Sequence, residues 1–182
     1  MKTRMLVASL ALVCSSTWAQ TCVTNQPLFQ EEGQLIDLEN GTVLDVKSNL
    51  LWSKCTLGQT YNQVDNSCSN GGATSYTTWQ EALQATENPV NTTVGTITGF
   101  RLPNIKELTS IVNYQCVFPA IDETLFPSTE NEPYWTNTPD APRNGTQINT
   151  GLNGLVINFA TGEEFIDQDR DRILIRLVKD YQ

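Results

Sequence analysis

The stretch FRLPNIKEL, residues 100–108, carries the clearest local structural signals in the chain. Its first three residues, Phe100-Arg101-Leu102, are typical of a strand, which Pro103 ends. Asn104 and Glu107 then form a capping box, in which the Asn side chain caps an early backbone N–H and the Glu reaches back. An apolar stripe follows at Ile105, Leu108, Ile111 and Val112. We therefore expect a strand that leads directly into a short, half-buried helix.

A second capping box begins the sequence TWQEAL, residues 78–83. The Thr78 hydroxyl can cap the helix while Glu81 reaches back to the chain before it. Trp79, Ala82 and Leu83 fall at i, i+3 and i+4 and so share one face of the helix. We interpret this face as core.

Strand signals dominate the rest of the chain. Asn40-Gly41 is a strong tight-turn signal, and Gly162 can supply the positive φ of a second hairpin connection. We expect strands at 34–38, 42–46, 49–52, 134–137, 155–159, 164–166 and 173–178, and long polar loops at 56–77 and 139–154. The fold class is therefore α+β, with two short helices, small antiparallel sheets and long loops.

The N-terminal residues are typical of a secretory signal peptide. Lys2 and Arg4 precede the apolar run 5–13, and small residues at Thr17 and Ala19 fit a cleavage site. We expect a signal peptide at 1–19 and one domain at 20–182. The apolar run is too short to span a membrane, which takes about 20 residues, so we expect no membrane insertion. A lipid anchor at Cys14 is the less favoured alternative because the preceding residue is Val13.

The charge balance is strongly acidic. The chain has 11 Lys and Arg against 20 Asp and Glu, and removing residues 1–19 leaves nine cations and a net charge of about −11. Nucleic acids are bound through cations that neutralise phosphate, so we expect no nucleic-acid partner. Anionic lipid surfaces are disfavoured for the same reason.

Four cysteines remain after the expected cleavage: Cys22, Cys55, Cys68 and Cys116. An even number in an exported protein indicates disulfides, and four cysteines permit three pairings. Cys55 and Cys68 flank a short segment rich in Gly, Asn, Asp and Ser, so we favour Cys55–Cys68, which leaves Cys22–Cys116. A zinc site is the weaker alternative because the chain has no histidine and no Cys-x-x-Cys pair.

Several segments, taken in order, resemble the C-terminal domain family of the Legionella collagen-like adhesin. They are DVKSNLLW (45–52), TWQEAL (78–83), FRLPNIKEL (100–108), FPAID (118–122), LFP (125–127), YWT (134–136), VINF (156–159) with Gly162, and RLV (176–178). The resemblance covers about residues 42–180. It implies a C-type-lectin-like fold and a cell-surface module whose copies oligomerise. The founding member binds sulfated glycans, whereas this chain is acidic, and Leu177 stands where the family usually has Cys.

The C-type-lectin likeness also directs attention to calcium. Such lectins bind Ca²⁺ and sugar through a Glu-Pro-Asn loop and a Trp-Asn-Asp strand, to which Asn131-Glu132-Pro133 and Trp135-Thr136-Asn137 are near matches. Separately, Asp167, Asp169 and Asp171 alternate as at the start of an EF-hand loop. Arg172 and Val178 stand where that loop needs Gly and Glu, so a solvated acidic turn is the preferred interpretation and Ca²⁺ the alternative.

The remaining candidates concern recognition. Tyr61, Tyr76, Trp135 and Asn137 are the candidate ligand-binding residues, although core packing is the preferred interpretation for Trp135 and sugar stacking its alternative. Arg101 and Arg176 are expected to pair with carboxylates inside the framework. Because the chain has no histidine, the usual general base is absent and we expect no enzyme. We expect an exported binding module of the periplasm or cell surface that recognises a glycan or an envelope protein through loops 56–77 and 139–154. A structural subunit of an envelope assembly is the alternative.

Overall fold

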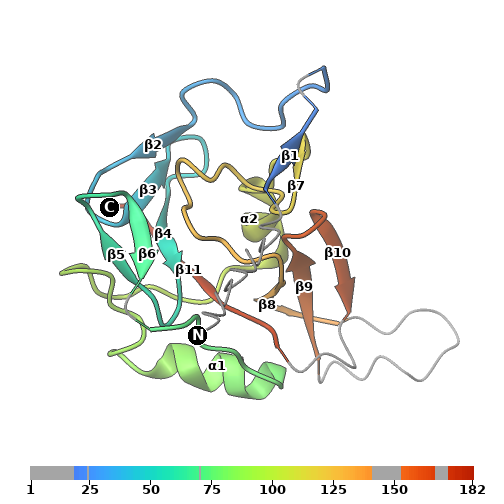
Figure 1. Ribbon diagram of the computed structural model, residues 1–182. Helices are drawn as coiled ribbons and strands as arrows, with labels where there is room; N and C mark the ends of the chain where they lie inside the picture. Colours follow the sequence, from blue (N-terminus) through green and yellow to red (C-terminus); the bar gives the residue numbers. More distant parts are fainter. Residues whose placement is uncertain (1–18, 24, 70, 141–152, 167–171) are drawn as a thin grey trace, which may run out of the picture.

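The computed structural model describes residues 19–23, 25–69, 71–140, 153–166 and 172–182 (Figure 1). The expected signal peptide lies outside them, except for Ala19. The described residues form two helices and four small antiparallel sheets, which confirms the α+β class. No helix in this part of the chain has the length and apolar character needed to cross a membrane. The C-type-lectin-like character implied by the resemblance stays a prediction.

The largest sheet is four-stranded, in the order β11-β4-β3-β2. Its strands are β2 (Leu35–Asp37), β3 (Thr42–Asp45), β4 (Leu50–Thr56) and β11 (Arg176–Asp180). The predicted turn joins β2 to β3: Gly41 has φ +89°, and the Asn40 side-chain oxygen accepts the Thr42 N–H at 3.1 Å. All seven residues of β4 are buried, because β3 and β11 pair with its edges and apolar side chains cover both its faces.

The second sheet is three-stranded, in the order β10-β9-β8. It contains β8 (Pro133–Pro139), β9 (Gly154–Asn158) and β10 (Glu163–Ile166). Gly162 adopts φ +81° in the connection from β9 to β10, so the predicted hairpin is confirmed. Most of the expected loop 139–154 lies outside the described residues.

The expected strand 173–178 differs from the prediction. Its first half forms a parallel bridge to β8, in which the Trp135 N–H donates to the Leu174 carbonyl at 2.9 Å. Its second half becomes β11 and pairs with β4 as far as Asp180. The segment changes partners because the two sheets meet here, so one chain segment joins them. The strand expected at 100–102 is also reduced to a single bridge, Arg101 to Val178.

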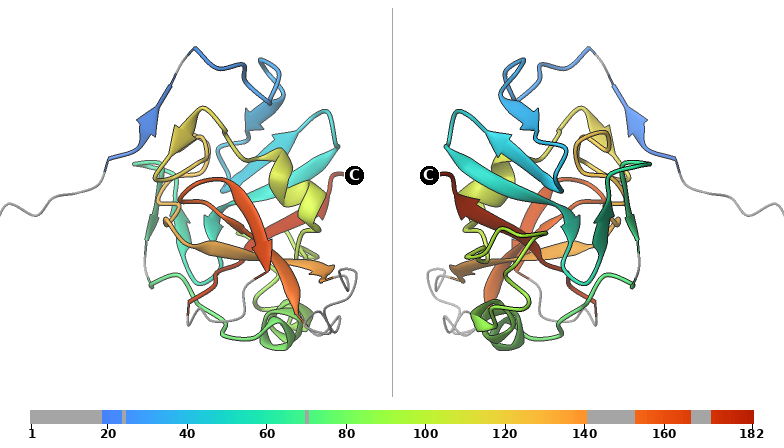
Figure 2. Two further views of the ribbon diagram at one scale, coloured as in Figure 1. Left: turned by 90° about the vertical axis from the view of Figure 1, so that its right-hand side faces the viewer. Right: turned by 90° about the vertical axis from the view of Figure 1, so that its left-hand side faces the viewer.

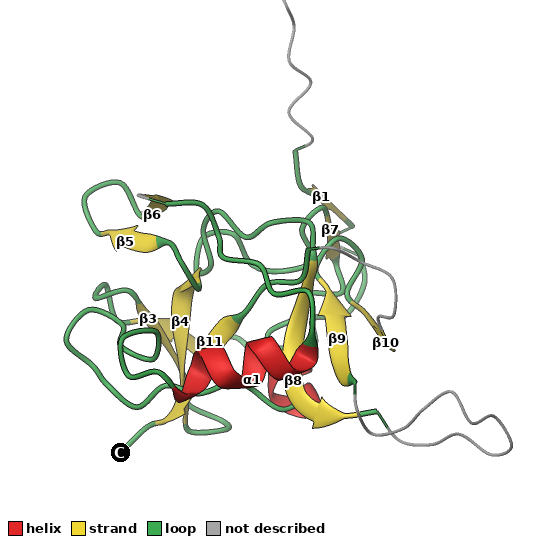
Figure 3. Cartoon of the chain, turned by 90° about the horizontal axis from the view of Figure 1, so that it is seen from below, coloured by secondary structure: helices red, strands yellow, loops and turns green. Residues whose placement is uncertain are grey.

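Both helices begin where the capping boxes predicted. They are α1 (Trp79–Glu87) and α2 (Ile105–Ser110), and each box is complete. Figure 3 shows α1 lying across β8 and β11. Trp79 fixes it there, because its indole N–H donates to the Thr136 carbonyl at 2.8 Å and its ring lies against Gly154.

The core has two parts that lie on opposite faces of β4. Leu50 and Trp52 belong to the first part and Leu51 to the second. The first part also contains α2 residues and the aromatic pair Tyr134 and Phe159, whose rings meet edge to face with centroids 4.9 Å apart. The second part contains α1 and the residues that lead to β11. Side chains therefore alternate along β4 between two cores.

Two short antiparallel strand pairs, one of them a hairpin, carry the disulfides. β5 (Thr60–Asn62) pairs with β6 (Ser67–Ser69), and Cys68 of β6 is bonded to Cys55. β1 (Thr21–Cys22) pairs with β7 (Cys116–Val117), and this pair is closed by Cys22–Cys116 (Figure 2). Both favoured pairings are confirmed. The expected loop 56–77 is wrong in part, because the disulfide and Tyr61 hold its centre as the β5–β6 hairpin.

Arg101 and Arg176 have different partners. Arg101 pairs with Glu107 at 2.8 Å and with Asp180 at 3.0 Å, as expected. Arg176 is fully buried and has no carboxylate partner among the described residues. It donates to the carbonyls of Ser53 and Lys54 and to the Thr129 hydroxyl. The expectation for Arg176 is therefore wrong, because the Ser53 and Lys54 carbonyls of β4 accept the hydrogen bonds that a carboxylate was expected to accept.

Candidate functional site

Trp135 is not available to a ligand. Its side chain is only 2% exposed and belongs to the second part of the core. Its indole N–H donates to the Tyr76 carbonyl at 3.0 Å, so its one polar group is already paired. The preferred core interpretation of Trp135 is confirmed and its choice as a ligand-binding candidate is wrong, since a ring enclosed on all sides cannot stack on a sugar.

The other three candidate residues lie in different places. Tyr76 is half-buried, bridges to Ile173 and lines a shallow hollow beside α1. Asn137 is exposed near the end of β8, and its backbone N–H donates to the Pro103 carbonyl. Tyr61 lies on the β5–β6 hairpin and lines a second hollow. The structure therefore does not bring Tyr61, Tyr76 and Asn137 together into one site.

The candidate calcium ligands Asp167, Asp169 and Asp171 lie outside the described residues, so Ca²⁺ binding there stays a prediction. Among the residues that the structure does describe, no three His, Cys, Asp or Glu side chains lie close enough together to hold a metal ion.

A buried lysine positions Tyr61. The ammonium of Lys54, fully enclosed beneath the hairpin, donates to Asp37 at 2.6 Å and to Asn66 at 2.6 Å. It also lies 4.7 Å from the centre of the Tyr61 ring, a cation–π distance. The Tyr61 hydroxyl donates in turn to the Asn66 side-chain oxygen at 3.1 Å. These contacts hold Tyr61 rigidly against the four-stranded sheet.

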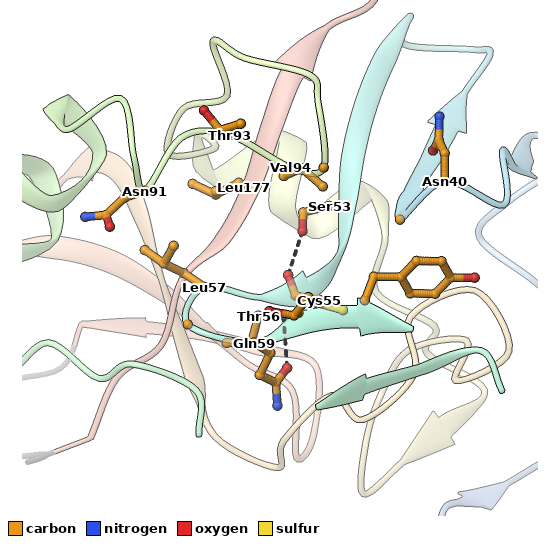
Figure 4. A pocket seen from close by; sticks show the side chains of 15 residues that line it. Asn40, Ser53, Cys55, Thr56, Leu57, Gln59, Asn91, Thr93, Val94 and Leu177 are labelled. Atoms are coloured by element: carbon orange, nitrogen blue, oxygen red, sulfur yellow. Dashed lines mark hydrogen bonds between the residues drawn. The ribbon is translucent and has the colours of Figure 1, made fainter. Parts of the chain in front are cut away.

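Tyr61 forms one wall of a hollow of about 200 Å³, which we call the uncharged hollow (Figure 4). Three segments surround it: the β2–β3 turn, the end of β4 with the chain into β5, and residues 91–95. Figure 4 shows Asn40 and Asn91 on opposite sides and Gln59 below. Its lining consists of Asn40, Gly41, Ser53, Cys55, Thr56, Leu57, Gly58, Gln59, Thr60, Tyr61, Asn91, Thr93, Val94, Gly95 and Leu177.

The hollow offers neutral hydrogen-bonding groups. Asn40 and Gln59 use their side-chain oxygens to accept the backbone N–H groups of Thr42 and Thr56. No hydrogen bond to a described residue uses their amide NH₂ groups. Asn91 is arranged the other way, since its NH₂ donates to the Ala85 carbonyl at 2.9 Å and its oxygen has no described partner. The site therefore presents both donors and acceptors.

Glycine allows the segments around the hollow to approach closely. Gly58 has φ +97°, and a Cβ added there would lie 2.3 Å from the Thr74 hydroxyl. A Cβ added at Gly41 would lie 3.2 Å from the Tyr61 Cβ. Since the Cys55–Cys68 disulfide also holds this wall, the hollow is preformed.

The lining contains no Asp, Glu, Lys or Arg, and its single cysteine, Cys55, is in a disulfide. The arrangement can hold a neutral polar molecule by hydrogen bonds and by contact with Tyr61, Val94 and Leu177. Sequence reasoning named only Tyr61 as a candidate ligand-binding residue, although the loop 56–77 that it expected to recognise the ligand also contributes residues 56–60 to the lining. Asn40 carried a turn signal, Gln59 lay in the expected recognition loop without being singled out, and Asn91 had no local signal that marked it as a binding residue.

These features define a disulfide-bonded α+β domain with a preformed polar hollow, and its two disulfides are typical of an extracytoplasmic protein. The family model of the Lcl C-terminal domain matches residues 41–179, so the chain belongs to this family, an adhesin-associated one, and the resemblance noted above is confirmed. Neither a curated protein nor a solved structure matches the chain.

Proposed function

We propose that this protein is a non-catalytic binding module of the periplasm or cell surface, and that it binds an uncharged glycan in the uncharged hollow. The observation that carries the proposal is the lining itself. It combines the unused NH₂ groups of Asn40 and Gln59 and the unused side-chain oxygen of Asn91 with an immobilised Tyr61, and contains no charged side chain. Sugar hydroxyls both donate and accept hydrogen bonds, so they match this mixed set.

The size of the hollow limits what it can hold. Its volume of about 200 Å³ lies below the range of roughly 300–1,000 Å³ that is typical for drug-sized ligands. One sugar ring is a better match than a long oligosaccharide segment. A few neutral hydrogen bonds, each worth about 0.5–1.5 kcal/mol net, support weak binding with a Kd of roughly 0.1–1 mM.

A sulfated glycan is a poor match to this hollow. Sulfate groups need Arg or Lys, and the lining has neither. The whole chain also carries a formal net charge of −9, which repels polyanions. We therefore expect this chain to differ from the founding member of the family that it resembles, which binds sulfated glycans.

The first experiment is a glycan array that presents neutral glycans and their sulfated counterparts, with and without Ca²⁺. The protein should come from a host that does not glycosylate Asn-x-Thr, because Asn40 and Asn91 both lie in such sequons. We expect neutral glycans to bind and sulfated ones not to bind. Binding confined to sulfated glycans, or absent from the whole array, would contradict the proposal.

Two isosteric variants then locate the site. Asn40→Asp and Gln59→Glu keep the oxygens that accept the Thr42 and Thr56 N–H groups but replace the unused NH₂ with a carboxylate oxygen. Each lost hydrogen bond should weaken glycan binding about 2–10-fold, measured by calorimetric titration. Gln63→Glu is the matched control, because Gln63 is exposed and outside the hollow. Equal weakening by the control would show that added charge, not the hollow, decides binding.

A further inference from the structure

An apolar groove of about 290 Å³ lies between residues 25–33, which we call the N-terminal strap, and the chain that follows α2. It shares no lining residue with the uncharged hollow. Leu28, Leu35, Ile111 and Leu125 form its apolar lining. Ile111 belongs to the first part of the core, and Leu35 and Leu125 pack against it. The groove therefore opens onto the core.

The strap is fixed by hydrogen bonds. The Gln30 side-chain NH₂ donates to the carbonyls of Ser110 and Val112, at 2.9 and 2.8 Å, at the end of α2. The Gln115 side chain donates to the Gln26 carbonyl. In Figure 1 the strap crosses the top of the molecule between β1 and β2. Because these bonds hold both its walls, the groove exists before any partner arrives, which lowers the entropy lost on binding.

Exposed apolar side chains gather beside the groove. Leu28 is 57% and Phe29 60% exposed, and the Phe29 ring meets Tyr114 edge to face with centroids 6.1 Å apart. Val23, Leu28, Phe29, Tyr114 and Phe118 are five of the ten exposed large apolar residues in the described part of the chain. Scattered exposed apolar residues are normal, but half of them in two short segments make a patch typical of an interaction surface.

Charge decides which partner fits. Glu31, Glu32 and Asp122 line the groove, and no Lys or Arg does. Lys47 neutralises Glu31 at 2.7 Å, whereas Glu32 and Asp122 have no cationic partner among the described residues. A second copy of this chain is disfavoured because each copy carries a formal charge of −9. A sugar does not match an apolar lining. The lining is therefore complementary to a ligand that carries an apolar group flanked by positive charges.

We propose that the apolar groove docks a segment of another protein that places a large apolar side chain in the groove and Lys or Arg beside Glu32 and Asp122. The apolar side chain contacts Leu28, Leu35 and Leu125. The cations pair with the carboxylates of Glu32 and Asp122, of which Asp122 also accepts hydrogen bonds from Thr124. This inference does not depend on the proposed glycan binding, because the two sites share no residue.

The test uses short fluorescent peptides as probes and measures their anisotropy. The main probe alternates Leu with Lys; one control replaces each Lys with Glu, and the other replaces each Leu with Ser. We expect the Leu–Lys peptide to bind at least tenfold more tightly than either control, because both the apolar and the charged contacts are needed.

Protein variants then assign the site. Leu28→Ser should weaken binding of the Leu–Lys peptide about tenfold, and Glu32→Gln about threefold. Leu28 is already exposed, so its variant should fold, as thermal unfolding will verify. Val64→Ser is the matched control, because Val64 is 96% exposed and lies on the β5–β6 hairpin, away from the groove.

Each of the following results of the peptide test would overturn the proposal. The Leu–Lys peptide fails to bind, or Leu28→Ser binds it as tightly as the unaltered protein does, or the Glu-containing peptide binds equally well. The other occupant to test is a second copy of this chain, and light scattering measures the oligomeric state. A dimer that Leu28→Ser abolishes would assign the groove to a second copy and contradict a cationic partner.

Discussion

At the scale of single residues, Arg176 is a fully enclosed charge without a carboxylate partner among the described residues. Its guanidinium lies 5.0 Å from the Phe126 ring and 5.7 Å from the Tyr134 ring. Burial lowers the pKa of Arg176, although the Tyr134 hydroxyl opposes this effect. Aromatic faces and backbone oxygens therefore compensate for the missing carboxylate. Arg176 joins β11 to the end of β4, close to the wall of the uncharged hollow.

Replacing this side chain should be costly. Arg176→Met removes the donors to Ser53, Lys54 and Thr129 and leaves their buried oxygens unpaired, so we expect a loss of about 3 kcal/mol or more in the free energy of unfolding. Arg101→Met, whose side chain is 37% exposed, should lose about 1 kcal/mol or less. Urea unfolding of both variants gives the comparison. Equal losses would show that the carbonyl contacts of Arg176 contribute little.

At the scale of elements, the N-terminus of α1 depends on the charge of Glu81. The carboxylate accepts from the Thr77 hydroxyl at 3.0 Å and from the backbone N–H groups of Thr77 and Thr78. These bonds, the Thr77 side-chain bond first, lower the pKa of Glu81 below its ordinary value of 4.5. The capping box therefore works best when Glu81 is ionised.

This shift makes part of the stability pH-dependent. Since the folded pKa is the lower one, the contribution of Glu81 is complete above about pH 4.5 and is lost as the pH falls through the folded pKa. NMR titration should place the Glu81 midpoint below 4.5. Glu81→Gln keeps an acceptor but should remove this pH dependence from unfolding curves, and Glu39→Gln should not. A midpoint at or above the ordinary value would refute the capping contact.

The contact between α1 and β9 has no room for an added methyl group. A Cβ at Gly154 would lie 2.3 Å from a carbon of the Trp79 ring. Gly154→Ala should therefore displace Trp79 and cost about 1–3 kcal/mol, measured by thermal unfolding. Gly72→Ala is the control, because nothing lies within 4 Å of its added Cβ. If both substitutions are equally mild, the Trp79 packing described above is wrong.

At the scale of the whole molecule, the two disulfides have separate roles. Cys22–Cys116 joins residues 94 apart in sequence and Cys55–Cys68 residues 13 apart. In the loop-entropy model, loops of about 100 and 15 residues contribute about 4.7 and 3 kcal/mol. We therefore expect the double Ala variant of Cys22 and Cys116 to unfold more easily than that of Cys55 and Cys68.

The effect of the two double Ala variants on glycan binding should follow the opposite order from their effect on stability. Cys55 lines the uncharged hollow, so its double Ala variant should bind the array-selected glycan more weakly. The Cys22 and Cys116 variant, whose disulfide lies at β1–β7, should bind normally at a temperature where it is folded. Calorimetric titration of both variants provides the measurement. A binding loss confined to the Cys22 and Cys116 variant would contradict the site assignment.

The sequence predicted the features that local rules determine. The capping boxes at Thr78 and Asn104, the Asn40-Gly41 turn and the Gly162 hairpin depend on residues close together in the chain, and all four are confirmed. The family resemblance was confirmed as well.

Long-range contacts were the features that the sequence did not reveal. The segment 173–178 divides between two sheets because β8 and β4 meet it at different points. Arg176 donates to backbone carbonyls instead of a carboxylate, and no local sequence pattern predicts these partners. The uncharged hollow combines Asn40, Gln59 and Asn91 from three separate segments, so only the folded chain brings their amides together.

The central claim is that ligand recognition depends on neutral hydrogen bonds in the uncharged hollow. Its most direct test is a titration of one array-selected glycan, unsulfated and sulfated, at about 0.05 and 0.5 M NaCl, a range over which salt strongly screens exposed charges. We predict that the unsulfated form binds more tightly and that its Kd is the same at both salt concentrations. Tighter binding of the sulfated form, weakened at high salt, would contradict the claim.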